Sequence, residues 1–179
     1  MAKGYNGREL IAVLNKYLPA GAMVLELGMG PGKDLDLLAQ RYTVTGSDTS
    51  REFLELYREK QPEADLLKLD ATTIETDRSF DCIYSNKVLH HLSKSDLRYS
   101  FTCQQQLLTD GGLLMHSFWY SDKEEESYGL RFVYYTEDEL LNTIGPGFEV
   151  VAMEHYKEIE DSDSLYHLLR KTKQMMISA

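Results

Sequence analysis

Short apolar segments alternate with amphipathic, helix-like segments along most of this chain, and that alternation restricts its fold more than any other feature. The expected strands are residues 23–27, 42–46, 65–69, 80–85 and 113–119. The expected helices include residues 10–18 and residues 51–60, the second of which Ser50 is expected to cap. Strands separated by helices favour a mostly parallel sheet that is covered on both faces.

The C-terminal part of the chain departs from this alternation. Residues 148–159 form a long strand-like segment, residues 161–164 form a polar turn, and residues 165–170 return as a second segment. This pattern predicts an antiparallel hairpin. Together with the five preceding strands it predicts an α/β fold: a doubly wound, mostly parallel seven-stranded sheet that ends in a C-terminal antiparallel hairpin.

Three further expectations concern the connections between these segments. Ser95 is expected to cap a helix that ends at residues 110–112, where an aspartate precedes two glycines. Residues 120–135 are acidic and aromatic and lack a clear period, so they are expected to form a loop. Thr136, with Glu139 three residues later, predicts a capping box for a short helix.

Length, charge and composition exclude several classes of protein. The 179 residues fit one domain, which we expect to span residues 1–179. The formal net charge of −10 would repel a phosphate backbone, so nucleic acid is not an expected partner. No apolar run is long enough for a membrane span and no apolar signal region follows the first residues, which favours a cytoplasmic protein without a membrane partner. Cys82 and Cys103 belong to no Cys-x-x-Cys pair or Cys/His set, so no metal site is expected.

Glycines follow the first expected strand, at the sheet edge where α/β proteins bind ligands. This strand contains Glu26, and after it come glycines at alternate positions: Gly28, Gly30 and Gly32. Such a spacing gives a tight turn and lets a ligand approach the backbone closely. The next helix offers free amide groups to a carboxylate. The sixth position counted from Gly28 is Lys33, whereas the dinucleotide-binding pattern has glycine there, which counts against a pyrophosphate-binding turn.

Acidic and amide side chains follow the next three strands. Asp48 can accept hydrogen bonds from both hydroxyls of a ribose with its two carboxylate oxygens, or it can simply start the next helix. Asp70 can accept from an adenine amino group while the backbone amide of Ala71 donates to a ring nitrogen. Asn86 follows the fourth strand. Each of these motifs, taken alone, is equally compatible with a cap or a turn.

The ordered set of motifs resembles the class I, Rossmann-like S-adenosylmethionine-dependent methyltransferases, and in particular their small-molecule (type 11/12-like) branch. The motifs that carry the resemblance are residues 23–32, 46–48, 69–71, 80–92 and 107–114. The resemblance implies S-adenosylmethionine as cofactor, S-adenosylhomocysteine as product, and methyl transfer to a small-molecule acceptor by in-line displacement. Members of the family that act on amide or exocyclic base nitrogens often carry Asn-Pro-Pro-Tyr after the fourth strand. Residues 85–88 differ from that motif, which counts against a nucleobase or glutamine acceptor.

The same resemblance implies a role for each strand-end residue. Glu26 would hold the methionine amino group, often through water, and the three glycines would pass beneath the methionine and ribose. Asp48 would bind both ribose hydroxyls, and Thr49 would flank the adenine. Asp70 and Ala71 would contact the adenine edge.

On the acceptor side, the resemblance places Asn86 at the methionine end and the sulfonium. A general base is needed only if the acceptor carries a proton that must leave early, and the candidates are His90 and His91. Adjacent residues on a helical turn point about 100° apart, so one of the two is expected to face the site, with His91 preferred. A packing or capping role is the alternative. Several aromatic residues either line the acceptor pocket or cover the sheet end: Tyr5, Trp119, Tyr120, Tyr128, Tyr134 and Tyr135.

Two other functions stay open on the sequence. The first is a nicotinamide-dependent oxidoreductase, against which Lys33 and the Asp70 and Asn86 motifs count. The second is a methyltransferase-like binding or regulatory protein that lacks turnover. The intact acidic residues at the strand ends count against a complete loss of activity.

Overall fold

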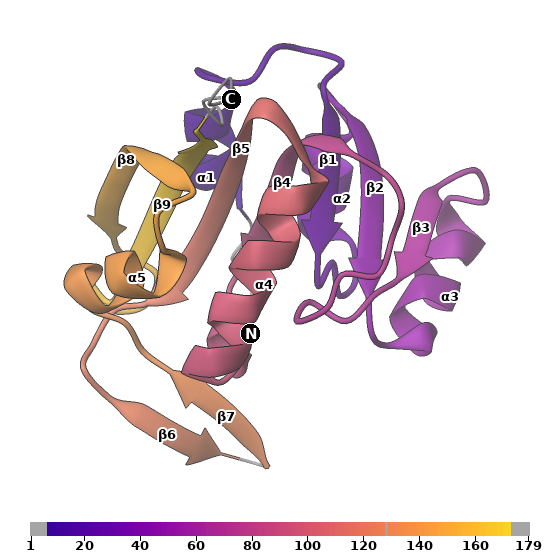
Figure 1. Ribbon diagram of the computed structural model, residues 1–179. Coiled ribbons are helices and arrows are strands. Elements are labelled where there is room, and N and C mark those ends of the chain that lie inside the picture. Colours follow the sequence, from indigo (N-terminus) through magenta and orange to yellow (C-terminus); the bar gives the residue numbers. More distant parts are fainter. Residues whose placement is uncertain (1–6, 128, 173–179) are drawn as a thin grey trace.

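The computed structural model describes residues 7–127 and 129–172 (Figure 1). The strands of its main sheet are β1 (Met23–Leu27), β2 (Thr43–Asp48), β3 (Asp65–Lys68), β4 (Phe80–Asn86), β5 (Leu108–Trp119), β8 (Phe148–Tyr156) and β9 (Ser164–Lys171). The helices are α1 (Arg8–Leu14), α2 (Lys33–Leu38), α3 (Arg51–Lys60), the 3₁₀ helix η1 (Leu89–His91), α4 (Lys94–Leu107) and α5 (Glu137–Ile144). The seven strands lie in the order β3-β2-β1-β4-β5-β9-β8.

The strands from β3 to β5 run parallel, and β9 runs antiparallel between β5 and β8. The predicted seven-stranded, mostly parallel sheet with its C-terminal antiparallel hairpin is therefore confirmed. Because β1 lies in the middle of the parallel part, Glu26 pairs with Gly46 on one side and with Tyr84 on the other. The carboxyl ends of the parallel strands meet at one edge of the sheet, and the strand order reverses beside β1. Ligands of open α/β sheets bind at such a point.

Helices cover both faces of this sheet, because successive residues of a strand point to opposite faces. Leu25 and Ile83 pack in one cluster with residues of α4 and α5. Their neighbours Val24 and Cys82 pack in a second cluster with residues of α1 and α2. Figure 1 shows the resulting three layers. The sheet is thus held between two apolar layers, and its polar strand-end residues project only at the edge.

The cap of α4 differs from the prediction, because Ser93 rather than Ser95 occupies the N-cap position. The backbone of Ser93 is extended, and its Oγ accepts a hydrogen bond from the Asp96 amide at 3.1 Å. The hydroxyl of Ser95 is paired with that of Ser93 instead. Either serine could accept from the backbone amide three residues later, so the sequence alone did not show which of the two is the cap.

The end of α4 also differs from the prediction. The helix ends at Leu107, and residues 110–112 belong to β5. Leu108 pairs with Phe80 and Leu113 pairs with Cys82, so the residues between them bulge out of the ladder. A bulge that contains glycine resembles a helix end in sequence, which explains the error.

The expectation of a loop over residues 120–135 is wrong. This segment contains the two-stranded hairpin of β6 (Glu124–Ser127) and β7 (Leu130–Val133). The hairpin packs against η1, where the ring of Phe132 lies 5.5 Å from that of His90 and 4.8 Å from that of His91. Contact with a distant part of the chain thus stabilises strands that have no alternating pattern of their own.

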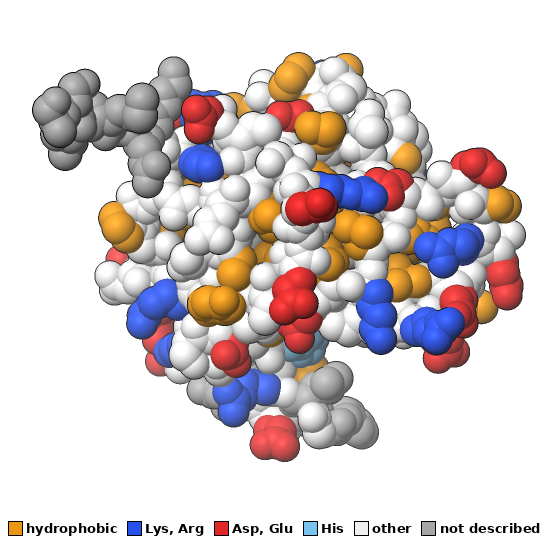
Figure 2. Space-filling view, turned by 45° about the vertical axis from the view of Figure 1, so that its right-hand side comes forward, with side chains coloured by type: hydrophobic (Ala, Val, Ile, Leu, Met, Phe, Trp, Pro, Cys, Tyr) orange, Lys and Arg blue, Asp and Glu red, His pale blue; other side chains and the backbone are white. Residues whose placement is uncertain are grey.

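The predicted caps of α3 and α5 are confirmed. Ser50 Oγ accepts from the Phe53 amide at the start of α3, and Thr136 and Glu139 form a reciprocal capping box at the start of α5. No helix in the described part of the chain is long and apolar enough to cross a membrane. On the face drawn in Figure 2, Lys and Arg side chains are interspersed with Asp and Glu side chains.

Candidate active site

A pocket opens at the carboxyl ends of β1 and β4, with a cavity volume of about 100 Å³. The residues that line it are Glu26, Gly28, Met29, Pro31, Lys33, Asp34, Asn86, Lys87, Val88 and Glu158. Two of the predicted cofactor-binding side chains, Glu26 and Asn86, are therefore brought together. Asp34, Lys87 and Glu158 are polar members of the pocket that the sequence analysis did not single out.

Glu26 is the most unusual side chain of the pocket. It is 3% exposed, and its Oε2 atom has no hydrogen-bond partner among the described residues. Burial raises the pKa of its carboxyl well above the ordinary value, and the nearby acidic residues, Asp34 first, raise it further. A buried carboxylate oxygen without a donor is destabilising by about 1–3 kcal/mol or more. A bound ammonium group would supply the missing donor and a compensating charge.

The glycine turn after β1 is set by both backbone angles and packing. Gly28 has φ +66°, a left-handed conformation, and a Cβ there would lie 2.6 Å from either Cγ of Val88. Gly30 and Gly32 also have positive φ, at +50° and +82°. Position 28 therefore requires glycine for contact with the segment after β4, in addition to any close approach of a ligand.

Asp48 at the end of β2 links the glycine turn to α3. Its Oδ2 accepts from the Gly30 amide at 2.9 Å, and its Oδ1 accepts from the Ser50 amide at 2.8 Å. Ser50, not Asp48, is the N-cap of α3, so Asp48 does more than begin the helix. Each carboxylate oxygen can accept more than one hydrogen bond, so capacity for ribose hydroxyls remains. Thr49, exposed, follows it.

Asp70 and Ala71 lie beside Asp48 at the same sheet edge. The Leu69 amide donates to the Asp48 carbonyl at 3.2 Å, which joins the ends of β2 and β3. Asp70 is exposed, and its Oδ1 accepts from the Thr72 amide. The carbonyl of Ala71 accepts from Ser100 Oγ at 2.6 Å. The residues expected around an adenosine thus lie outside the pocket that contains Glu26, farther along the edge.

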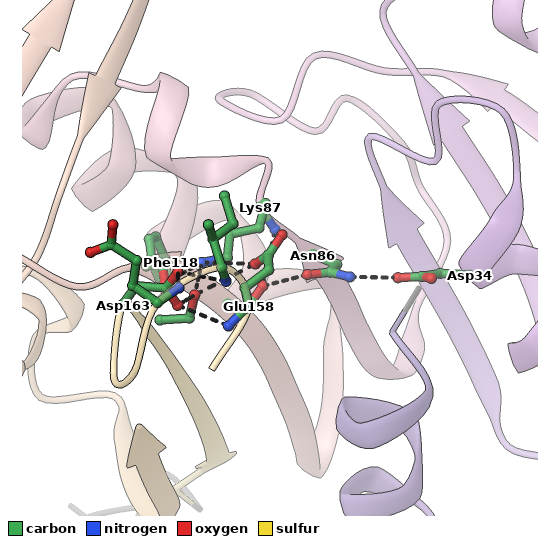
Figure 3. Close-up of polar contacts among 10 residues, drawn as sticks. Asp34, Asn86, Lys87, Phe118, Glu158 and Asp163 are labelled. Carbon is green, nitrogen blue, oxygen red and sulfur yellow. Dashed lines mark hydrogen bonds and ion pairs between the residues drawn. The ribbon is translucent and has the colours of Figure 1, made fainter. Parts of the chain in front are cut away.

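Asn86 is held at both ends of its amide (Figure 3). Its Nδ2 donates to Asp34 Oδ2 at 2.9 Å, and its Oδ1 accepts from Ser117 Oγ at 2.6 Å. Asp34, which is buried, also accepts from the Tyr84 hydroxyl and from the Gly7 amide. Asp34 therefore fixes the position of Asn86. The only sequence signal that could have identified Asp34 is its location, one residue into the helix after the glycine turn.

The two histidines of η1 have different environments, and neither lines the pocket. His90 is 2% exposed, and burial lowers its pKa to about 2. His91 is exposed, and its Nδ1 lies 2.8 Å from the Arg131 carbonyl. Because a carbonyl only accepts, Nδ1 carries the hydrogen, and neutral His91 has its lone pair on Nε2. His91 is therefore the exposed ring of the two, and His90 is the buried one.

The aromatic residues expected around an acceptor are dispersed. Trp119 lies nearest the pocket, with its ring centroid 3.6 Å from Lys87 Nζ. Tyr120 packs edge-on against His155, and Tyr135 is buried against Phe118 in the core. Tyr134 is half-buried. Two members of the predicted group, Tyr5 and Tyr128, lie outside the described residues.

The arrangement as a whole is that of a doubly wound α/β protein with a glycine turn and acidic and amide side chains along the carboxyl edge of its sheet. A family model described as a methyltransferase domain matches residues 24–112. The chain belongs to the class I S-adenosylmethionine-dependent methyltransferases, as the sequence motifs indicated.

Individual relatives agree with this assignment, but each match covers only part of this chain and part of the relative. Trans-aconitate 2-methyltransferase of Variovorax paradoxus (strain S110) is 41% identical over 76 residues, which cover 40% of this chain and 29% of that protein. The tRNA (carboxymethyluridine(34)-5-O)-methyltransferase of Arabidopsis thaliana is 27% identical over 139 residues, which cover 76% of this chain and 34% of that protein. The chain thus spans about a third of the length of these curated relatives.

Solved structures share the fold over nearly the whole chain. One is the 1,6-didemethyltoxoflavin-N1-methyltransferase of Burkholderia thailandensis, crystallised with 1,6-didemethyltoxoflavin and S-adenosylhomocysteine. It matches with a TM-score of 0.80 at 22% identity, and the match covers 93% of this chain and 78% of that chain. The Rossmann-like methyltransferase fold is therefore confirmed.

Proposed function

We propose that this chain transfers the methyl group of S-adenosylmethionine to a small-molecule acceptor by in-line displacement. The observation that carries the proposal is Glu26, whose buried Oε2 atom lacks a donor in the pocket beside the glycine turn. The ammonium group of the methionine moiety supplies the donor and the positive charge that this carboxylate needs.

The remaining cofactor contacts follow from the order of residues along the sheet edge. Asp48, which already anchors the glycine turn, would accept from both ribose hydroxyls. Asp70 and Ala71 would contact the adenine edge, and Thr49 would flank it. Asn86, fixed by Asp34 at 2.9 Å, would face the sulfonium. The pocket of about 100 Å³ is too small for the whole cofactor, so we assign it to the methionine end.

S-adenosylmethionine supplies a methyl group that is already activated by the positive sulfur. The protein has to align an acceptor with that group and exclude water, which proximity and orientation can achieve without a strong base. Where the acceptor has to lose a proton, His91 is the candidate base, because its tautomer leaves Nε2 free to accept. His90, buried and with its pKa lowered to about 2, is assigned a packing role.

A tRNA acceptor is the second candidate. It is favoured by the match to the plant tRNA methyltransferase, which is 27% identical over 76% of this chain. The formal net charge of −10 opposes it, because a phosphate backbone is bound by clusters of Lys and Arg. The interspersed charges on the face in Figure 2 oppose it as well. A gel-shift titration with unfractionated tRNA at low salt would distinguish the two acceptors, and tight binding would favour the tRNA.

Calorimetric titration with S-adenosylmethionine and S-adenosylhomocysteine tests the proposal, with NAD as the control ligand. We expect micromolar binding of the two adenosyl ligands and a loss of roughly tenfold or more in Glu26→Gln and in Asp48→Asn, since each removes a charge-assisted contact. Glu52→Gln is the matched control, because Glu52 is exposed on α3. Tight binding of NAD alone, or no binding of either adenosyl ligand by a folded protein, would refute the proposal.

A further inference from the structure

A buried ion pair of Lys87 and Glu158 lines one side of the pocket. The glycine turn and α2 lie on the other sides. Lys87 follows Asn86 directly, and Glu158 lies in the connection between β8 and β9. Their charged groups lie 3.4 Å apart, and their side chains are 10% and 7% exposed. Both residues line the same pocket as Glu26. Figure 3 shows Lys87 and Glu158 beside Asn86. The pair therefore lies beside the residue that the proposed function places at the sulfonium.

Lys87 is fully engaged within the protein. Its Nζ donates to the Phe118 carbonyl at 2.7 Å and to Ser164 Oγ at 2.8 Å, and its third hydrogen can point to Glu158 Oε2. The ammonium also lies over the Trp119 ring at 3.6 Å. Three hydrogens thus have three acceptors. Lys87 has φ +56°, a strained conformation for a residue other than glycine, which the surrounding contacts have to stabilise. Lys87 is therefore an anchor and has no hydrogen left for a ligand.

Glu158 is held in place by its own loop. Asp163 accepts from three backbone amides of that loop, those of Glu158, Ile159 and Glu160, at 2.8–2.9 Å. These bonds fix the backbone from which the Glu158 side chain extends into the pocket. Its Oε2 atom faces Lys87 and Ser164. No described residue donates to the Oε1 atom of this largely buried side chain, so one carboxylate oxygen is left for a ligand in the pocket.

The charge of this end of the pocket selects among acceptors. A carboxylate acceptor would be placed against Glu158, with Glu26 and Asp34 lining the same pocket, and Lys87 has no free hydrogen to offset the repulsion. An N–H group, by contrast, would satisfy Glu158 Oε1 through a charge-assisted hydrogen bond. We propose that Glu158 binds the nitrogen of a small amine, which is the methyl acceptor. This inference rests on the proposed methyl transfer and specifies its substrate class.

The transfer to an amine balances without a further reactant. An acceptor that arrives as an ammonium ion first loses one proton to water. The nitrogen lone pair then forms the new N–C bond while the C–S bond breaks, and its electron pair returns to sulfur, which becomes a neutral thioether. The methylated nitrogen is positively charged and loses a proton to water afterwards. Glu158 accepts an N–H hydrogen bond throughout and orients the lone pair.

The test is binding of matched probes to the complex with S-adenosylhomocysteine, measured by ligand-observed NMR. The probes are benzylamine, benzyl alcohol and benzoate, and butylamine, butanol and butyrate, each at about 1 mM. We expect at least one amine to bind more tightly than its alcohol and carboxylate partners. Glu158→Gln should weaken the amine about tenfold or more and abolish its preference over the alcohol.

Glu160→Gln is the matched control, because it makes the same change in an exposed residue of the same loop. It should leave the preference for the amine intact. Equal affinity for the three chemical classes, preference for a carboxylate, absence of amine binding, or an unchanged preference in Glu158→Gln would each overturn the inference. The titration with S-adenosylhomocysteine comes first. A protein that fails it fails the proposed function, whereas one that passes it and rejects both amines fails this inference alone.

Discussion

Acid should destabilise this protein through three buried histidines, and replacement of His167 should remove a defined part of that effect. His90, His116 and His167 are each 2% exposed or less. Burial lowers the pKa of His90 to about 2 and that of His167 to about 3, and burial followed by the charge of His167 lowers that of His116 well below the ordinary value of 6.5. The unfolded chain binds protons that the folded chain excludes. The stability is therefore present above about pH 6.5 and is lost as the pH falls below it.

The magnitude follows from the same linkage. At about pH 5.5, one unit below the ordinary pKa, each excluded proton favours the unfolded state by about 1.4 kcal/mol. The three histidines together should therefore reduce the free energy of unfolding by about 4 kcal/mol between about pH 7.5 and pH 5.5. Small domains have only about 5–15 kcal/mol of stability in total. The contribution of the histidines is therefore a large part of that total, and the raised pKa of the Glu26 carboxyl acts in the opposite direction.

His167→Leu isolates one third of this effect. Neither ring nitrogen of His167 has a hydrogen-bond partner among the described residues, and the ring lies near those of Phe101 and Phe118. Leucine should therefore be tolerated, and the variant should lose about 1.4 kcal/mol less than the wild type over the same pH range. Urea denaturation at the two pH values measures both losses. Equal losses in wild type and variant would refute the linkage argument.

Three further changes test the turn, the network behind the pocket and the corrected helix cap. Gly28→Ala should destabilise the protein by about 1–3 kcal/mol, because φ is positive at this position and the new Cβ would collide with Val88. Val88→Ala should restore part of the lost stability in thermal unfolding, and no such rescue would contradict the contact. Asp34→Asn should cost about 1–3 kcal/mol in urea denaturation, because three donors share the carboxylate and an amide leaves at least one of them unsatisfied; an unchanged midpoint would rule out that role. Ser93→Ala should cost about 1 kcal/mol and Ser95→Ala much less, and the reverse order would restore the original cap assignment.

The positions of the residues at the carboxyl edge of the sheet were predictable because their signals are local. A short apolar strand, a glycine turn and an acid at the next strand end each lie within a few neighbouring positions. Gly28, for example, requires a left-handed backbone wherever this turn occurs. Parallel strands in such sheets end at one edge, so locating the strands was enough to bring Glu26, Asp48 and Asn86 to that edge.

The hairpin of β6 and β7 could not be predicted in the same way. Its strands carry no alternation, and they form where Phe132 reaches the rings of His90 and His91, some 40 positions earlier in the chain. The same hairpin distinguishes the histidines, since Phe132 stacks on the buried ring of His90 and the Arg131 carbonyl fixes the tautomer of His91. Adjacent positions in the sequence gave no means of distinguishing them.

The sequence by itself determined the class of sheet, the place of the glycine turn and the order of the strand-end residues that we propose bind the cofactor, because short-range periodicity and backbone restrictions encode them. Only the tertiary structure decided how the pocket is completed. Asp34 reaches Asn86 across 52 positions, and Lys87 reaches Ser164 across 77. A polar contact over such a separation leaves no pattern in either segment of the sequence. Each partner becomes buried, and so needs the other, only when the chain folds.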